Sequence, residues 1–423
     1  MGGSGIGQLS ALEVLDAGGD PALEVVCVLR SGATGRAVAA SGEASGSTGL
    51  APLLDGGTRH GGRGLRSALA AVEGEIAAAL AGRDAFDQRG VDLALVDLDG
   101  TPTRSRLGAG TLLAVSLAVA RAAAEASGLP LYRYLGGVTA ISLPLPLVSL
   151  GSRGRAAGGR RGGADVMAVP LGAASFDEAL RWALDVARAL ERSIDARAGV
   201  PAGEALGLAV EAIESAGRVP GEEVALAVDA AAYGTPSAAG VVGGSPPASR
   251  PPPPSAEVAA AIERWGSACA RFPVVSLEDP LPTSEPAAWE ELRAVLGEGV
   301  QLVDGELLSA PGSIGGAIDL SSAGGRSALG LDLARAGTLT EALGAVERTR
   351  SGGLACVAEA GTRETEDAAL ADLGVAAGCG QLRGGPPAGS EHAAKYSRLL
   401  RIERELGESA LFPGAAALAR PRS

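Results

Sequence analysis

A series of short apolar runs, each ending in a charged residue, most constrains what this chain can fold into. The clearest run, residues 272–277, ends in the carboxylates of Glu278 and Asp279, and Pro280 follows directly. An apolar run of this length predicts a buried parallel strand with its carboxylates at the C-terminal end. Similar runs end at five other charged residues: Asp229, Asp304, Asp332, Glu359 and Arg383.

The spacing of these strand ends predicts the architecture. From Glu278 onward, successive ends lie 24 to 28 residues apart. A strand, a helix and two short loops need about that length. Regular alternation of this kind predicts a βα barrel, in which the carboxyl ends of the strands meet at one mouth and carry the chemistry. We therefore expect the charged strand ends to form a site.

Composition narrows the class of protein. The 423 residues suffice for a barrel and a smaller domain, and the net charge of −13 argues against nucleic acid or an anionic membrane as a partner. The N-terminal residues lack the features of a signal peptide, and no uninterrupted apolar run is long enough to cross a bilayer, so we expect a cytoplasmic protein. The four cysteines show no metal-binding spacing and are predicted to be buried, reduced thiols.

The region before the barrel reads as an α+β module. A strand is predicted at 22–29, and a glycine-rich segment at 41–49 follows it. Helices are predicted within 64–81, 84–98 and 110–127, and the last is so apolar that it should be buried.

Seven motifs resemble those of the enolase family, and they occur in the family's order and spacing from about residue 8 to 410. They are LDAGGDP at 15–21, DLDGTP at 97–102, LPLYRY at 129–134, SLEDP at 276–280, AGTLTE at 336–341, ETED at 364–367 and LLRIE at 399–403.

The resemblance implies an α/β enolase fold. An N-terminal α+β capping domain would cover residues 1–136, and a TIM-like βα barrel of the ββαα(βα)6 type would cover 137–423. The barrel would carry a Pro/Gly/Ser-rich insertion at 234–255, which is too polar and proline-rich for a core element. The resemblance further implies a lyase of glycolysis, phosphopyruvate hydratase, which converts 2-phosphoglycerate to phosphoenolpyruvate and water with Mg²⁺. It also implies a homodimer, or here a heterodimer with an active enolase.

The resemblance places two metal ligands at Asp229 and Glu278. The third ligand position is Gly305, and the acids on either side of it should point away because strand side chains alternate. Two carboxylates hold Mg²⁺ poorly, because the ion keeps its waters tightly. We therefore expect weak or absent Mg²⁺ binding.

The resemblance also assigns the remaining site positions. Asp332 stands where the family has its lysine base, and the only lysine of the chain, Lys395, belongs to the C-terminal helical segment. A carboxylate is a much weaker base than an amine, since its ordinary pKa is near ~4 rather than ~10. The other positional equivalents are Arg383 for a second lysine, Arg155 for a histidine, Ala164 for a catalytic glutamate, and Thr362 and Ser47 for substrate-binding residues.

Together these changes predict a catalytically impaired enolase homologue with a role in binding or assembly, and a small phosphorylated acid is a candidate ligand. The alternative is an active enolase, or a related Mg²⁺-dependent dehydratase, that uses Asp332, Arg155 and Arg383 in altered roles. A third alternative is a decaying gene whose product has no maintained function. Family membership does not decide among them, because one fold hosts several functions.

Overall fold

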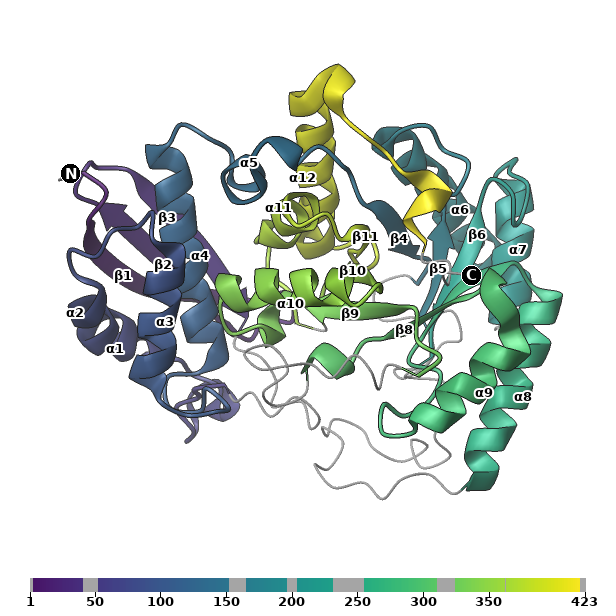
Figure 1. The fold of residues 1–423 in the computed structure, drawn as a ribbon, viewed down its shortest axis with the longest axis horizontal. Helices are drawn as coiled ribbons and strands as arrows, with labels where there is room; N and C mark the ends of the chain where they lie inside the picture. The colour runs from purple at the N-terminus through teal and green to yellow at the C-terminus, as the bar shows by residue number, and fades with distance from the viewer. Residues whose placement is uncertain are drawn as a thin grey trace.

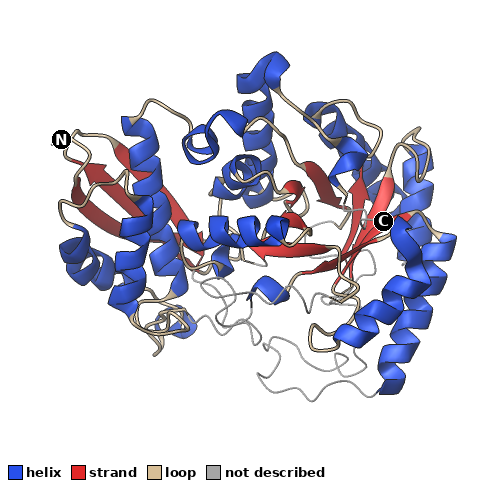
Figure 2. Cartoon of the chain, viewed as in Figure 1, coloured by secondary structure: helices blue, strands red, loops and turns tan. Residues whose placement is uncertain are grey.

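The computed structural model describes residues 3–40, 52–151, 165–195, 204–230, 255–309, 324–361 and 363–418. A three-stranded antiparallel sheet with its own helices precedes a closed eight-stranded barrel surrounded by helices (Figures 1 and 2). The predicted combination of an α+β cap and a βα barrel is confirmed.

The N-terminal sheet has the order β1-β2-β3, with antiparallel pairing throughout. Helix α4 (Ala109–Ala126) lies against this sheet and is buried along most of its length, as its apolar sequence predicts. It is long and apolar enough to cross a membrane by composition, yet 78% of it is buried inside the protein, as in a core helix. Gly35 permits the close packing, because a Cβ there would lie 2.0 Å from the Ala118 carbonyl oxygen. The elements are β1 (Ile6–Leu15), β2 (Pro21–Leu29), β3 (Thr34–Ala40), α1 (Arg66–Ala71), a π-helical turn (Val72–Ile76), α2 (Ala77–Leu80), α3 (Gln88–Asp99), α4 and α5 (Leu131–Gly136).

The barrel closes in the order β10-β11-β4-β5-β6-β7-β8-β9. Strand β5 runs antiparallel to both neighbours, and all other pairs are parallel. The six runs predicted from sequence are strands β6 to β11. The strands are β4 (Leu145–Ser149), β5 (Asp165–Val169), β6 (Ala225–Asp229), β7 (Val274–Glu278), β8 (Gln301–Asp304), β9 (Ala328–Asp332), β10 (Ala355–Glu359) and β11 (Gly380–Arg383).

Helices cover the outside of the barrel, and local sequence signals set where they begin. At the start of helix α10, the Thr338 hydroxyl accepts a hydrogen bond from the Glu341 backbone nitrogen at 3.3 Å, as the N-cap residue of a capping box does. Pro286 opens α9, where its missing N–H removes no intrahelical bond. The barrel helices are α6 (Phe176–Asp195), α7 (Ala205–Ser215), α8 (Ser255–Arg271), α9 (Pro286–Leu296), α10 (Leu339–Ser351), α11 (Ala369–Ala376) and α12 (Ser390–Leu406).

The barrel interior is packed. At the end opposite the mouth, the Gln301 amide nitrogen donates to the Ser276 hydroxyl at 3.0 Å and to the Gln381 side-chain oxygen at 2.9 Å. Apolar side chains fill the rest of the interior. Buried polar groups that are fully hydrogen-bonded stabilise one register of the strands. The apolar side chains that fill the interior are Leu145, Leu147, Met167, Val169, Ala227, Val303, Ala328 and Val357.

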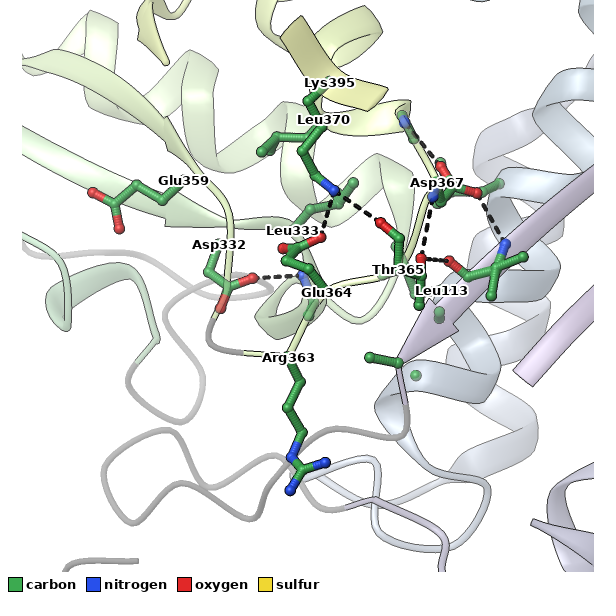
Figure 3. Close-up of a pocket in the computed structure, with 17 residues that line it drawn as sticks. Leu113, Asp332, Leu333, Glu359, Arg363, Glu364, Thr365, Asp367, Leu370 and Lys395 are labelled. Carbon is green, nitrogen blue, oxygen red and sulfur yellow. Dashed lines mark hydrogen bonds and ion pairs between the residues drawn. The ribbon is translucent and has the colours of Figure 1, made fainter. Parts of the chain in front are cut away.

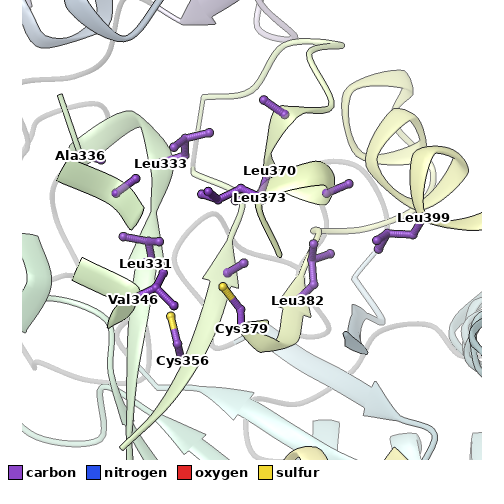
Figure 4. Close-up of a cluster of buried hydrophobic side chains, with 14 of the residues drawn as sticks. Leu331, Leu333, Ala336, Val346, Cys356, Leu370, Leu373, Cys379, Leu382 and Leu399 are labelled. Atoms are coloured by element: carbon purple, nitrogen blue, oxygen red, sulfur yellow. The ribbon is translucent and has the colours of Figure 1, made fainter. Parts of the chain in front are cut away.

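A second apolar layer separates the strands from the outer helices, and Figure 4 shows part of it around β9 to β11. Cys356 and Cys379 both belong to this layer. All four cysteines are free thiols in the structure; three of them are buried as predicted, and Cys269 is partly buried.

Candidate active site at the barrel mouth

The guanidinium of Arg383, at the end of β11, is the centre of the site. Its Nη1 lies 2.6 Å from Asp229 Oδ2, and its Nη2 lies 3.1 Å from Glu278 Oε1 and 3.3 Å from Glu359 Oε2. These partners end strands β6, β7 and β10, so one cation joins four strand ends at the mouth. The structure thereby brings together three of the residues predicted from sequence: Asp229, Glu278 and Arg383.

Two of the carboxyl groups around Arg383, those of Glu278 and Glu359, are hard to ionise. Burial raises the pKa of Glu359 to about 7, although Arg383 opposes the shift. Burial likewise raises the pKa of Glu278 well above its usual range. Burial alone would lower the pKa of Arg383, but the facing carboxylates outweigh that effect and raise it. The guanidinium therefore keeps its charge, whereas burial disfavours the charged forms of Glu278 and Glu359.

A further acid at the mouth, Asp165, was not predicted from sequence. It begins β5 and pairs in register with Asp229, and it accepts a hydrogen bond from the Ser149 hydroxyl. Burial raises its pKa to about 6. Ala164, the residue assigned to the catalytic glutamate by resemblance, lies outside the described residues, and the carboxylate at this point of the mouth comes one residue later.

We expect Asp165→Asn to stabilise the protein above pH 7. The pKa of Asp165 is raised from 3.8 to about 6 in the folded state. The folded protein thus favours the protonated acid, and stability is lost as the pH rises through about 6. An amide keeps an acceptor for Ser149 without this loss. The gain should be about 1–3 kcal/mol at pH 8 and near zero at pH 4, by urea unfolding.

Glu290→Gln, on the exposed face of α9, serves as the control and should change stability equally little at both pH values. A destabilised Asp165→Asn at pH 8 would show instead that the ionised carboxylate is needed against Arg383.

The third metal-ligand position, Gly305, faces the acidic group. A Cβ built there would lie 3.0 Å from Asp279 Oδ2 and 3.2 Å from Glu278 Oε1. Asp304 is turned away from it, as predicted, and forms a fully buried ion pair with Arg326 at 2.6 Å. Asp304 is thus committed to a structural contact and supplies no ligand to the mouth.

Asp332, the residue at the position of the family's base, ends β9 next to Glu359 on β10. It accepts a hydrogen bond from the Ala334 backbone nitrogen at 2.9 Å and lies 3.3 Å from Arg335 Nε. Burial raises its pKa. Asp332 and Glu359 line a small pocket between the barrel and the capping domain, whose β3 and α4 form the other wall (Figure 3).

Lys395 reaches the same pocket from helix α12 (Figure 3). Its Nζ lies 2.6 Å from Glu364 Oε2 and donates to the backbone oxygens of Thr365 at 3.1 Å and Glu391 at 2.9 Å. The amine therefore carries three partners and is only 1% exposed. Sequence alone placed this lysine in a helical segment but gave no sign that it lies beside the mouth.

Three predicted site residues, Arg155, Thr362 and Ser47, lie outside the described residues, and so does nearly all of the proline-rich segment 234–255.

The protein-family model of the enolase N-terminal domain matches residues 6–135. The family model of the enolase C-terminal TIM barrel domain matches residues 140–420. The chain belongs to the enolase family. It is 39% identical over 431 aligned residues to the enolase of Acidothermus cellulolyticus (strain ATCC 43068 / DSM 8971 / 11B), and the match covers 98% of each chain.

Enolases use Mg²⁺, and the residues present here do not fit that ion. Within the described parts of the chain, no group of three Asp, Glu, His or Cys side chains is arranged to hold a metal. Two causes are visible: the cationic side chain of Arg383 lies on Asp229 and Glu278, and Gly305 offers no carboxylate. Mg²⁺ needs near-octahedral oxygen ligands, which this arrangement does not provide.

Proposed function

We propose that this enolase-family protein does not convert 2-phosphoglycerate at an enzymatic rate and acts through binding or assembly. The observation that carries the proposal is Asp332, a partly buried carboxylate at the position of the family's lysine base. Removing a proton next to a carboxylate needs a strong base and cations to hold the developing charge. Asp332 supplies neither, and it adds negative charge where an anionic substrate would sit.

The surrounding residues support the same proposal. Lys395 does not replace the missing base, because its amine is paired with Glu364 and donates to two backbone oxygens. Mg²⁺ binding is proposed to be weak or absent. A small phosphorylated acid remains the candidate ligand, and the cytoplasm the proposed location.

For assembly we propose pairing with a second copy or with an active enolase. Strand β1 forms an edge of the N-terminal sheet, and its Leu12 and Leu15 are 56% and 64% exposed. Exposed apolar side chains on an edge strand are a common partner surface. Sedimentation of the chain alone and mixed with an active enolase measures both pairings, and a monomer in both runs contradicts them.

A second candidate, an enolase-type dehydratase with a remodelled site, is favoured by one observation. The pKa of Glu359 is raised to about 7, near the value that suits a general acid or base at neutral pH. The 39% identity to an enolase across the whole chain agrees with this alternative.

We expect purified protein with excess Mg²⁺ to form no phosphoenolpyruvate from 2-phosphoglycerate in an absorbance assay. An ordinary enzyme turns over at ~10 s⁻¹. Asp332→Ala and Glu359→Gln are the matched controls, because contaminating host enolase gives the same rate in all three preparations. A rate that falls in either variant belongs to this chain and supports the dehydratase instead.

A further inference from the structure

Arg383 reaches across the barrel mouth from β11 to carboxylates on distant strands. In the closed barrel, β4 and β5 lie between β11 and β6, and β7 is one strand further. The guanidinium nevertheless contacts the β6 carboxylate of Asp229 and the β7 carboxylate of Glu278. It therefore lies over the centre of the mouth, where the carboxylates from several strands converge.

Buried carboxylates that converge on one point need a cation among them if they are to stay ionised. The side chains of Glu278 and Glu359 are 6% and 4% exposed, and Asp229, which also faces Arg383, is 20% exposed. Like charges at such distances raise the cost of ionisation unless an opposite charge lies among them. In a metal enzyme a divalent ion meets this need. Here every one of the three acids has an oxygen within 3.3 Å of Arg383.

We propose that Arg383 is a permanent internal counter-ion that takes the place of a divalent cation. Part of the negative charge of the mouth is then balanced, and the mouth is closed to Mg²⁺, as soon as the chain folds. This inference goes beyond the proposed function, because it holds whichever ligand or partner the protein has. It also gives Asp229 and Glu278 a role in a protein whose third metal-ligand position is Gly305, because the two carboxylates bind the Arg383 guanidinium.

Arginine suits this role better than lysine. Its planar guanidinium carries five N–H donors and stays charged at any physiological pH. Two of its nitrogens serve three acids here. A lysine ammonium carries its three donors on one atom, so all its partners must approach that single point, whereas the guanidinium spreads its donors over three nitrogens.

The test is the effect of divalent cations on metal-depleted protein. The unmodified chain should show no change in melting temperature with millimolar Mg²⁺ or Mn²⁺, and no binding heat in calorimetry. Arg383→Met should melt at a lower temperature without metal. It should recover about 5 °C with an ion present at a hundredfold its Kd, because the freed carboxylates then bind that ion.

Two further variants sharpen the result. Arg335→Met removes an arginine at the same mouth that pairs with Asp332, and it should gain no response to Mg²⁺ or Mn²⁺. Arg383→Lys keeps a positive charge and should gain none either. If Arg383→Met is unfolded without metal, its refolding yield is measured with and without the two ions, and a yield that rises supports the proposal.

Either of two results overturns it. One is micromolar Mg²⁺ binding by the unmodified chain, which would mean that Arg383 moves aside for the ion. The other is an Arg383→Met variant whose melting temperature and refolding yield do not rise with either divalent ion.

Discussion

Arg326→Met is expected to lower the free energy of unfolding by about 3–5 kcal/mol, because it leaves a buried charge without its partner. Arg326 Nε lies 2.6 Å from Asp304 Oδ2, and the two side chains are 1% and 0% exposed. Arg326 also stacks on the Trp289 ring at 4.3 Å. Asp304 keeps three other donors, the Thr283 hydroxyl at 3.0 Å among them, so its position should be preserved while its charge loses the paired cation.

The matched control is the double variant Arg326→Met with Asp304→Asn. It removes both charges and should recover most of the loss, since the penalty arises from the unpaired carboxylate. Arg181→Met breaks an exposed pair with Asp177, whose side chains are 60% and 67% exposed, and should cost less than about 1 kcal/mol. Urea unfolding gives all three values. A loss below about 1 kcal/mol in the single variant would mean that the Asp304 carboxylate is accommodated without Arg326 at little cost.

Lys395→Met should destabilise the protein by a similar amount, about 3–5 kcal/mol at pH 8. Lys395 opposes the effect of burial, which raises the pKa of Glu364. When Lys395 is replaced by methionine, its amine is lost and the pKa of Glu364 should rise further. An acid with a raised pKa in the folded state contributes stability at low pH and loses it as the pH rises. The loss should therefore be larger at pH 8 than at pH 5, where Glu364 takes up a proton.

Adding Glu364→Gln to Lys395→Met should remove both the loss and its pH dependence. Thermal unfolding at the two pH values measures this. Equal losses at both values would point to lost packing of the lysine chain, since packing does not depend on the charge of Glu364.

Much of the barrel could be predicted from sequence, because buried parallel strands have a simple signature. Each of β6 to β11 is a short apolar run that ends in a charged residue, and the model places all six within a residue or two of the prediction. The same rule failed for Asp165. Strand β5 is antiparallel, so its first residue, rather than its last, lies at the mouth. An acid directly before an apolar run was the signal available.

The contacts of Arg383 could not be predicted in the same way. Its position at a strand end follows from the apolar run before it, but its partners depend on how the strands close into a barrel. Asp229 is 154 residues away in sequence and Glu359 only 24, yet both lie within 3.3 Å. Gly305 shows the opposite case: alignment with the family predicted a missing ligand, and the model places that position against the acids.

The burial of Lys395 has a practical consequence. It is the only lysine among the 423 residues, and it is 1% exposed. A lysine-specific protease therefore finds no site on the folded protein and one peptide bond, between Lys395 and Tyr396, on the unfolded chain. Cleavage at that bond requires helix α12 to open, and each cleaved molecule yields two fragments. The rate of their appearance reports unfolding directly on a gel, without any attached probe.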